Sequence, residues 1–283
     1  MGMDPLVSVA WLADRLHQPN LVVLDATLPP VGVTPVADTH ARYLGQHIPG
    51  ALFFDIEALS DRSTSLPHML PTPAAFAQSM SALGVSDTDT LVVYEQGAVF
   101  SAPRAWWMLR TMSAATVHVL DGGLEAWTAA GKPTEAGPVQ RTPAVFRAAL
   151  ATEAVRDFTQ LQTLLASHAQ VVDARSAERF QGTAPEPRAG LRSGHMPGAC
   201  NVPYTALLNE GRFKSCSEIQ AVFASRGIDL AKPVTATCGS GVTAAVLALG
   251  LERCGATQVS LYDGSWAEYA QSPGAQILTG PED

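Results

Sequence analysis

Short runs of aliphatic and β-branched residues recur along the chain and are separated by longer stretches that carry helix signals. The clearest runs are VVL at 22–24, LVVY at 91–94, VV at 171–172 and VSLY at 259–262. Successive positions are apolar, without polar alternation, and this pattern is typical of parallel strands that are buried on both faces. The pattern therefore predicts an α/β fold built on mostly parallel sheets flanked by helices.

Capping residues predict two of the helices between these strands. Thr72 followed by Pro73 is typical of a helix start, and Gly84 is typical of a helix end. Ser217 and Gln220 have the spacing of a capping box, and Gly227 is the expected end of that second helix.

The chain contains the same three landmarks twice, in the same order. They are VVLDAT at 22–27 and VVDARS at 171–176, GQHIPGA at 45–51 and SGHMPGA at 193–199, and LDGGLEAW at 120–127 and YDGSWAEY at 262–269. This repetition indicates two homologous domains. We place the first domain at 1–135 and the second at 151–283, joined by a polar linker at 136–150 that contains glycine and proline.

Composition excludes several classes of function. With 283 residues, 47% of them hydrophobic, the chain can bury a large core. A net charge of −8 argues against a nucleic-acid binder with a basic face. No apolar run approaches the ~20 residues of a membrane span. The first residues carry acids and lack the basic region of a signal peptide, so we expect a soluble, cytoplasmic protein without a membrane partner.

The four cysteines, Cys200, Cys216, Cys238 and Cys254, all lie in the last third of the chain. No two of them form a C-x-x-C pair, so neither a zinc site nor a disulfide framework is indicated. A reactive cysteine would act alone, and we expect no metal and no organic cofactor.

The repeat also serves as an internal control. A feature present in both halves is interpreted as structural, whereas a chemically potent feature in one half is a candidate for function. On this basis we assign a structural turn role to His47 and His195, each of which precedes Pro-Gly-Ala. The aspartates at the predicted strand ends are expected to cap backbone N–H groups; they are Asp25, Asp121, Asp173 and Asp263.

The two halves differ most where Glu95 in the first half aligns with Cys238 in the second. Cys238 ends a predicted strand and is followed by Gly239, Ser240 and Gly241, and then by a predicted helix. Such a loop can direct backbone N–H groups and the positive helix N-terminus at one point, which would stabilise a thiolate nucleophile. The alternative is that Cys238 is an ordinary buried core residue.

The duplicated chain, the H-[IM]-P-G-A turns, the D-G-[GS] segments and the CGSGVTA loop at 238–244 resemble the two-domain rhodanese-fold sulfurtransferases. The resemblance covers nearly the whole chain, and the small neutral loop is similar to that of the 3-mercaptopyruvate sulfurtransferase branch. It implies two tandem rhodanese-like domains, of which the second is catalytic and the first is not. It also implies that the cysteine cycles through a persulfide.

The resemblance also implies the residues that bind the substrate. It places Arg179 and Arg188 on the substrate; neither has a counterpart in the first half, where Val31 and His40 occupy the equivalent positions. Arginine suits an α-keto acid because its planar guanidinium donates several hydrogen bonds at once. The loop residues Gly239, Gly241, Val242 and Thr243 complete the predicted substrate site, whereas Arg175 and Arg192 are expected at the surface.

A Ser-His-Asp relay of the family matches this chain at Ser240 and His68. The position of the acid, eleven residues before the histidine, holds Glu57 instead of aspartate. Three arrangements are left open: Glu57 completes the relay, Asp61 replaces it, or the relay is only a dyad.

The resulting prediction is an enzyme that moves sulfur from 3-mercaptopyruvate through a Cys238 persulfide to an acceptor and releases pyruvate. The expected acceptors are a small thiol, thioredoxin or cyanide. The alternatives are a thiosulfate sulfurtransferase and a non-enzymatic sulfur-carrying or regulatory module. A phosphatase is excluded because the position six residues after Cys238 is Ala244 instead of arginine, and a Walker loop is excluded because no Lys-Ser/Thr pair follows the glycines.

Overall fold

The computed structural model describes residues 4–33 and 36–281, which form two compact units. The first unit comprises the described residues of Met1–Arg62 together with Leu70–Ala151 and Glu210–Arg212. The second comprises Ser63–Met69, Thr152–Asn209 and the described residues of Phe213–Asp283. Each unit therefore includes a short segment from the other half of the sequence.

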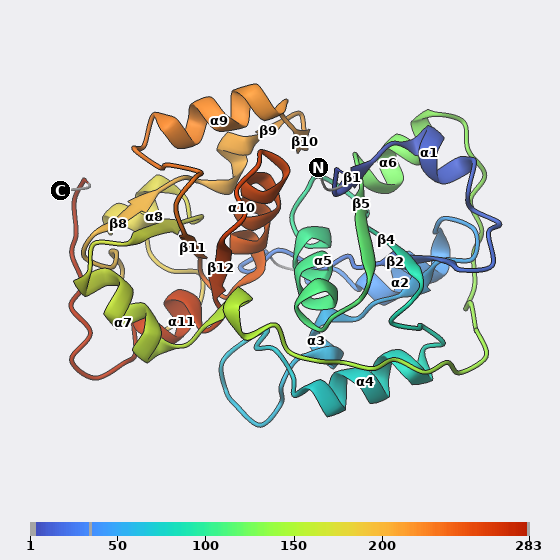
Figure 1. The fold of residues 1–283 in the computed structure, drawn as a ribbon, viewed down its shortest axis with the longest axis horizontal. Coiled ribbons are helices and arrows are strands. Elements are labelled where there is room, and N and C mark those ends of the chain that lie inside the picture. Colours follow the sequence, from blue (N-terminus) through green and yellow to red (C-terminus); the bar gives the residue numbers. More distant parts are fainter. Residues whose placement is uncertain (1–3, 34–35, 282–283) are drawn as a thin grey trace. The chain divides into compact units, whose positions relative to one another are not determined.

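The first unit is a parallel five-stranded sheet with helices on its faces (Figure 1). Its elements are β1 (Leu6–Val7), α1 (Val9–Ala13), β2 (Leu21–Asp25), α2 (Thr39–Gly45), β3 (Leu52–Phe53), α3 (Ile56–Leu59), α4 (Pro73–Ala82), β4 (Thr90–Tyr94), α5 (Ala102–Thr111), β5 (Thr116–Leu120) and α6 (Gly123–Ala129). The strand order is β1-β5-β4-β2-β3, and each neighbouring pair is parallel. The apolar runs at 22–24 and 91–94 lie in the central strands β2 and β4, as predicted.

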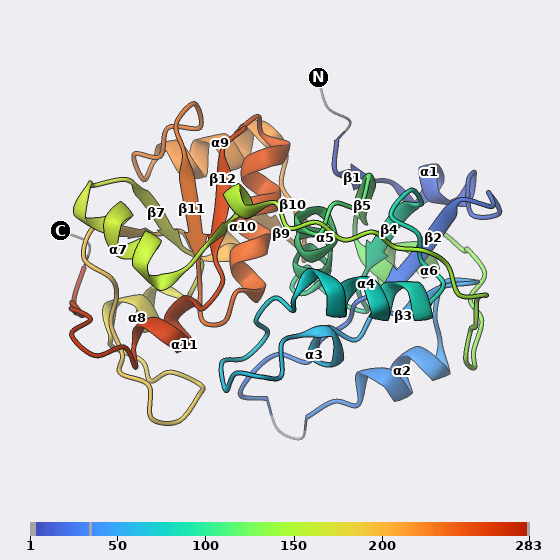
Figure 2. The same ribbon diagram turned by 60° about the horizontal axis from the view of Figure 1, so that its bottom comes forward.

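The second unit repeats this architecture (Figure 2). Its elements are η1 (Thr152–Ala154), β6 (Val155–Arg156), α7 (Phe158–Ala166), β7 (Gln170–Asp173), α8 (Ala177–Gln181), β8 (Ala199–Asn201), η2 (Tyr204–Leu207), β9 (Leu208–Asn209), β10 (Arg212–Phe213), α9 (Cys216–Ala224), β11 (Val234–Thr237), α10 (Val242–Arg253), β12 (Val259–Tyr262) and α11 (Ser265–Tyr269). The order β6-β12-β11-β7-β8 is that of the first sheet, strand for strand. The prediction of two α/β repeats is confirmed.

Each unit has its own hydrophobic core. In the first unit, Leu12 of α1 and Trp127 of α6 pack with Val23 of the central strand β2. In the second, Leu161 of α7 and Trp266 of α11 pack with strand residues such as Val171. Because the central strands are covered on both faces, they could be recognised as continuous apolar runs.

One predicted helix was confirmed and the capping of the other was wrong. The hydroxyl of Thr72 accepts a hydrogen bond from the backbone of Ala75 at the start of α4, and Gly84 follows the helix end with φ +80°. Helix α9 is capped by Ser215 with Glu218, not by Ser217 with Gln220. The sequence SCSEIQ offers both boxes, and a carboxylate in the first turn interacts more favourably with the helix N-terminus than an amide does.

Residues 136–150, which we predicted to be a linker, contain neither helix nor strand. They nevertheless pack along the first unit. The N–H of Ala144 donates to the carbonyl of Ser81, and buried Phe146 contacts Phe76 edge-on. The compact part of the first unit therefore extends to Ala151.

No helix in the described part of the chain is long and apolar enough to cross a bilayer. Within the same residues, no group of three or more His, Cys, Asp or Glu side chains is arranged to hold a metal ion. The four cysteines all lie among the described residues, and none of them is in a disulfide.

Candidate active site

Cys238 lies directly after the central strand β11. In the sheet register, Thr237 at the end of β11 is opposite Asp173 of β7, and Tyr94 at the end of β4 is opposite Asp25 of β2. Cys238 and Glu95 are the next residues along their strands. They therefore occupy equivalent positions in the two units, as the sequence repeat predicted.

The loop after Cys238 leads directly into the long helix α10. Gly241 is the N-cap of α10 and has φ +79°, a left-handed conformation that glycine adopts without strain. As a glycine, the N-cap residue has no side chain that could cap the helix, and the N–H groups of the first turn point toward the loop. Val242 and Thr243 are the first two residues of α10. The four predicted loop residues thus lie in the loop after the cysteine and in the first turn of α10.

The backbone at Cys238 is held from the start of α11. The N–H of Cys238 donates to Oγ of Ser265 at 3.3 Å, and the N–H of Trp266 donates to the carbonyl of Cys238 at 2.8 Å. The carbonyl of Gly239 accepts from the N–H of Ala267 at 2.9 Å. The thiol itself is protected from bulk water, because Cys238 is only 1% exposed.

The equivalent turn of the first unit holds a carboxylate. Glu95 accepts hydrogen bonds from the backbone N–H groups of Phe100 (2.9 Å), Ser101 (2.7 Å) and Ala102 (3.2 Å), and from the hydroxyl of Ser101 (3.0 Å). Burial raises the pKa of Glu95 to about 7 and outweighs these hydrogen bonds, which lower it. The turn between this strand and the next helix therefore concentrates N–H donors on an acidic group.

The two predicted substrate arginines lie beside the loop. A Cβ atom built on Gly239 would lie 3.0 Å from Nη2 of Arg179 and 4.0 Å from Nη1 of Arg188. The space next to the Gly239 backbone is therefore occupied by guanidinium groups, and a side chain there would crowd Arg179. Nε of Arg179 is buried, and the described residues supply no hydrogen-bond partner for it.

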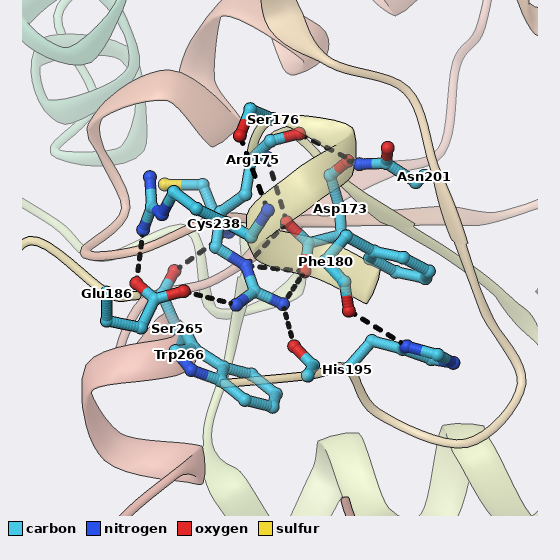
Figure 3. Close-up of polar contacts among 12 residues, drawn as sticks. Asp173, Arg175, Ser176, Phe180, Glu186, His195, Asn201, Cys238, Ser265 and Trp266 are labelled. Carbon is cyan, nitrogen blue, oxygen red and sulfur yellow. Dashed lines mark hydrogen bonds and ion pairs between the residues drawn. The ribbon is translucent and has the colours of Figure 1, made fainter. Parts of the chain in front are cut away.

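Arg175 was expected at the surface, and this prediction was wrong. Its guanidinium is buried between two carboxylates (Figure 3): Nη2 is 2.7 Å from Oδ2 of Asp173, and Nη1 is 2.8 Å from Oε1 of Glu186. It also lies over the ring of Trp266, at 4.0 Å from the centroid. Burial lowers the pKa of Arg175, but Asp173 and Glu186 outweigh burial, so the net pKa is raised. Arg192, by contrast, is exposed, as expected.

The structure brings Ser240 and His68 together. Nδ1 of His68 lies 3.0 Å from Oγ of Ser240, and both residues are buried. His68 belongs to the segment Ser63–Met69 of the second unit and has φ +60°. Glu57 and Asp61 belong to the first unit. The part of either acid in a relay stays a prediction.

The two repeated histidines have matching structural contacts. Nδ1 of His47 lies 2.8 Å from the carbonyl oxygen of Tyr43, and Nδ1 of His195 lies 3.0 Å from that of Phe180. Both rings are buried, and each histidine forms an isolated antiparallel bridge with a later segment of its own unit. These contacts agree with the turn role inferred from their presence in both halves.

Sequence reasoning missed two residues near the cysteine, Ser265 and Glu186. Ser265 could have been found, because it replaces Gly123 where YDGSW aligns with LDGGL. Glu186 gave no signal, because it lies among Thr, Pro and Gly residues in a loop without a repeated counterpart.

The rhodanese-like domain family matches this chain twice, at residues 8–130 and 157–272. The chain is 47% identical over 272 residues to the 3-mercaptopyruvate sulfurtransferase of Escherichia coli K12, covering 95% of this chain and 96% of that protein. It is also 43% identical over 272 residues to the thiosulfate sulfurtransferase of Gallus gallus, covering 93% and 92%. The crystal structure of SseA from Escherichia coli matches with a TM-score of 0.87 and 44% identity, covering 94% of this chain and 100% of SseA. The chain therefore belongs to the rhodanese-like domain family and carries two copies of that domain.

Proposed function

We propose that this protein is a 3-mercaptopyruvate sulfurtransferase that carries sulfur as a persulfide on Cys238. The observation that supports it best is the grouping of a cysteine, a helix N-terminus and two arginines around one glycine loop. The close similarity to a relative named 3-mercaptopyruvate sulfurtransferase supports the same substrate.

Arg179 and Arg188 bind the carboxylate and the keto oxygen of the substrate in this proposal. A carboxylate next to a carbonyl presents several acceptors in one plane, and guanidinium groups match that arrangement with paired donors. The unsatisfied Nε of Arg179 is one donor that such a ligand would use. Binding of this end holds the substrate sulfur next to Cys238 in an attack geometry.

The sulfur transfer balances without a cofactor. The Cys238 thiolate attacks the sulfur of 3-mercaptopyruvate, so an S–S bond forms while the C–S bond breaks. The electron pair of the broken bond leaves on pyruvate as an enolate, whose charge the arginines stabilise. A proton then converts the enolate to pyruvate. Ser240 and His68, hydrogen-bonded to each other, are the proposed residues for moving that proton.

The second half-reaction returns the cysteine to its thiolate. A thiol acceptor, either a small molecule or thioredoxin, takes the terminal sulfur as a persulfide, and cyanide takes it as thiocyanate. A cytoplasmic location belongs to the same proposal, because four cysteines outside any disulfide suit a reducing compartment. Cell fractionation followed by immunoblotting tests the location.

Thiosulfate is the competing sulfur donor, and similarity to the Gallus gallus thiosulfate sulfurtransferase favours it. The loop residues Gly239, Ser240 and Gly241 argue against it, because they carry no basic side chain for a dianion. The ratio of kcat/KM for 3-mercaptopyruvate to kcat/KM for thiosulfate decides between them. A ratio well above one supports the proposal, whereas a ratio below one makes thiosulfate the substrate.

The covalent step is tested by trapping sulfur on the protein. After treatment with 3-mercaptopyruvate and no acceptor, mass spectrometry should find one added sulfur atom on the peptide that contains Cys238. Cys238→Ser should abolish both the added sulfur and pyruvate release, while Cys254→Ser, the matched control, should retain both. An added sulfur on Cys254, or no pyruvate release by the wild type, would overturn the proposal.

A further inference from the structure

A chain of alternating charges leads from the central strand β7 to the substrate arginine Arg179. It runs from Asp173 through Arg175 and Glu186, all three buried, to Arg179. Taking the proposed function as its basis, we infer that Glu186 positions Arg179 for the carboxylate of the substrate. Glu186 would then be a positioning residue that acts through Arg179.

Each carboxylate oxygen of Glu186 is used by a different arginine. Oε1 accepts from Nη1 of Arg175 at 2.8 Å, and Oε2 accepts from Nη2 of Arg179. The side chain of Glu186 is only 2% exposed, so water contributes little to its solvation. Both oxygens therefore depend on these arginines, and the position of each guanidinium depends on Glu186.

The inner end of the chain is rigidly held. Arg175 donates from Nε and Nη2 to the carboxylate of Asp173, and from Nη2 to the carbonyl of Gly194 at 2.8 Å. Arg175 and Asp173 are both buried, and Figure 3 shows the guanidinium beside the carboxylate. Glu186 is consequently fixed on one side by a guanidinium that is itself anchored to β7.

The outer end places Arg179 against the catalytic loop. The nitrogen that Glu186 holds, Nη2 of Arg179, is the atom that would lie 3.0 Å from a Cβ on Gly239. Glu186 thus holds this guanidinium beside the residue that follows Cys238. Nε of the same guanidinium is left without a partner among the described residues, so a ligand oxygen can use it.

The effect of Glu186 depends on the chemistry of the sulfur donor. 3-Mercaptopyruvate presents a carboxylate that the held guanidinium can bind with paired donors, whereas thiosulfate has no carboxylate. Loss of Glu186 should therefore impair the use of 3-mercaptopyruvate more than the use of thiosulfate.

Glu186→Gln is the direct test. We expect KM for 3-mercaptopyruvate to rise about tenfold, the usual effect of losing a charge-assisted hydrogen bond, while kcat changes by less than about threefold. The thiosulfate to 3-mercaptopyruvate ratio of kcat/KM should rise by at least about tenfold. Glu178→Gln is the matched control, because it makes the same substitution at an exposed carboxylate on the helix that carries Arg179. It should leave KM and the donor ratio unchanged.

A double-mutant cycle separates positioning from general support of the fold. If Glu186 acts through Arg179, the double variant Glu186→Gln/Arg179→Ala should have the KM of Arg179→Ala alone. Additive effects on KM, or an unchanged donor ratio in Glu186→Gln, would overturn the inference. Should Glu186→Gln fail to fold, Glu186→Asp keeps the charge and shortens the side chain, so it should raise KM for 3-mercaptopyruvate, and an unchanged KM would refute positioning.

These outcomes are distinct from failure of the proposed function. If the wild type releases no pyruvate from 3-mercaptopyruvate, the proposed function fails and the inference fails with it. If the wild type is active and Glu186→Gln has wild-type kinetics toward both donors, only the inference fails.

Discussion

Ser265 fixes the backbone of the cysteine that the proposed reaction uses. Its hydroxyl accepts from the N–H of Cys238 at 3.3 Å and donates to the carbonyl of Tyr262 at 2.9 Å. Ser265 is 0% exposed and has φ +48°, in the left-handed region that residues with a Cβ rarely adopt. Ser265 therefore keeps its hydroxyl although its backbone conformation disfavours every residue except glycine.

The magnitudes of two substitutions follow from this geometry. Ser265→Ala leaves a buried N–H and a buried carbonyl without their partner, which costs about 2–4 kcal/mol of unfolding free energy. Ser265→Gly loses the same hydrogen bonds but relieves roughly 1–2 kcal/mol of left-handed strain. The freer unfolded chain of the glycine variant cancels roughly half of that relief. We therefore expect the order wild type, Gly variant, Ala variant, with the two variants about 0.5–1 kcal/mol apart.

Urea unfolding followed by tryptophan fluorescence measures this order, and Trp266 next to the substitution reports on the second unit. Pyruvate release should also slow in both variants, because the loop that carries Cys238 loses a backbone anchor. Gly123→Ser is the matched control in the first unit. A Cβ there would clash with the carbonyl oxygen of Glu95, so it should destabilise the fold without changing kcat of the folded enzyme. An alanine variant at least as stable as the glycine variant would refute the strain argument.

Three further predictions concern Arg188, the proposed relay and the buried carboxyl group of Glu95. Arg188→Ala should lower kcat/KM for 3-mercaptopyruvate by about 10–100-fold and for thiosulfate far less, since thiosulfate has no carboxylate; equal losses would contradict substrate docking on Arg188. If Glu57 completes the relay, Glu57→Gln should shift the pH–rate profile of pyruvate release and Asp61→Asn should not; an unchanged profile in Glu57→Gln removes Glu57 from the relay. The raised pKa of Glu95 should appear in carbon NMR of its carboxyl group as a midpoint near 7 instead of the ordinary 4.5. The folded state then binds this proton more tightly than the unfolded state, so the stability contributed by Glu95 is complete below about pH 4.5 and is lost as pH rises through about 7. A midpoint near 4.5 would contradict this prediction.

The fold could be predicted from sequence because its signals are local and repeated. Strands such as β2 and β11 are buried on both faces, so nearly every residue in them is apolar or small, and the pattern needs no knowledge of tertiary contacts. The repeated landmarks then predict which strand ends are equivalent in the two units. The predicted correspondence of Cys238 with Glu95 is confirmed by the sheet register.

The charged network could not be predicted, because burial of a charge is a property of the tertiary structure. Arg175 looks like a surface residue in its own segment, and only the approach of Glu186 from a later loop makes its burial tolerable. The capping of α9 failed for a different reason. Two overlapping capping boxes, starting at Ser215 and Ser217, have the same residue spacing. The box of Ser215 with Glu218 forms in the structure.

The two strand-to-helix turns suggest why a persulfide suits this position. In the first unit, the carboxylate of Glu95 accepts hydrogen bonds from the N–H donors of its own turn, so these donors cannot bind a substrate. The Cys238 thiolate ends one atom beyond Cβ, nearer the backbone than the carboxylate group of a glutamate. Adding one sulfur extends the side chain to Cβ–Sγ–S, which places the terminal charge as far along the side chain as the carboxylate carbon of glutamate. On the proposed mechanism, the donors at the start of α10 would therefore stabilise the persulfide anion better than the free thiolate. Sulfur would thus be held after pyruvate leaves, until an acceptor removes it.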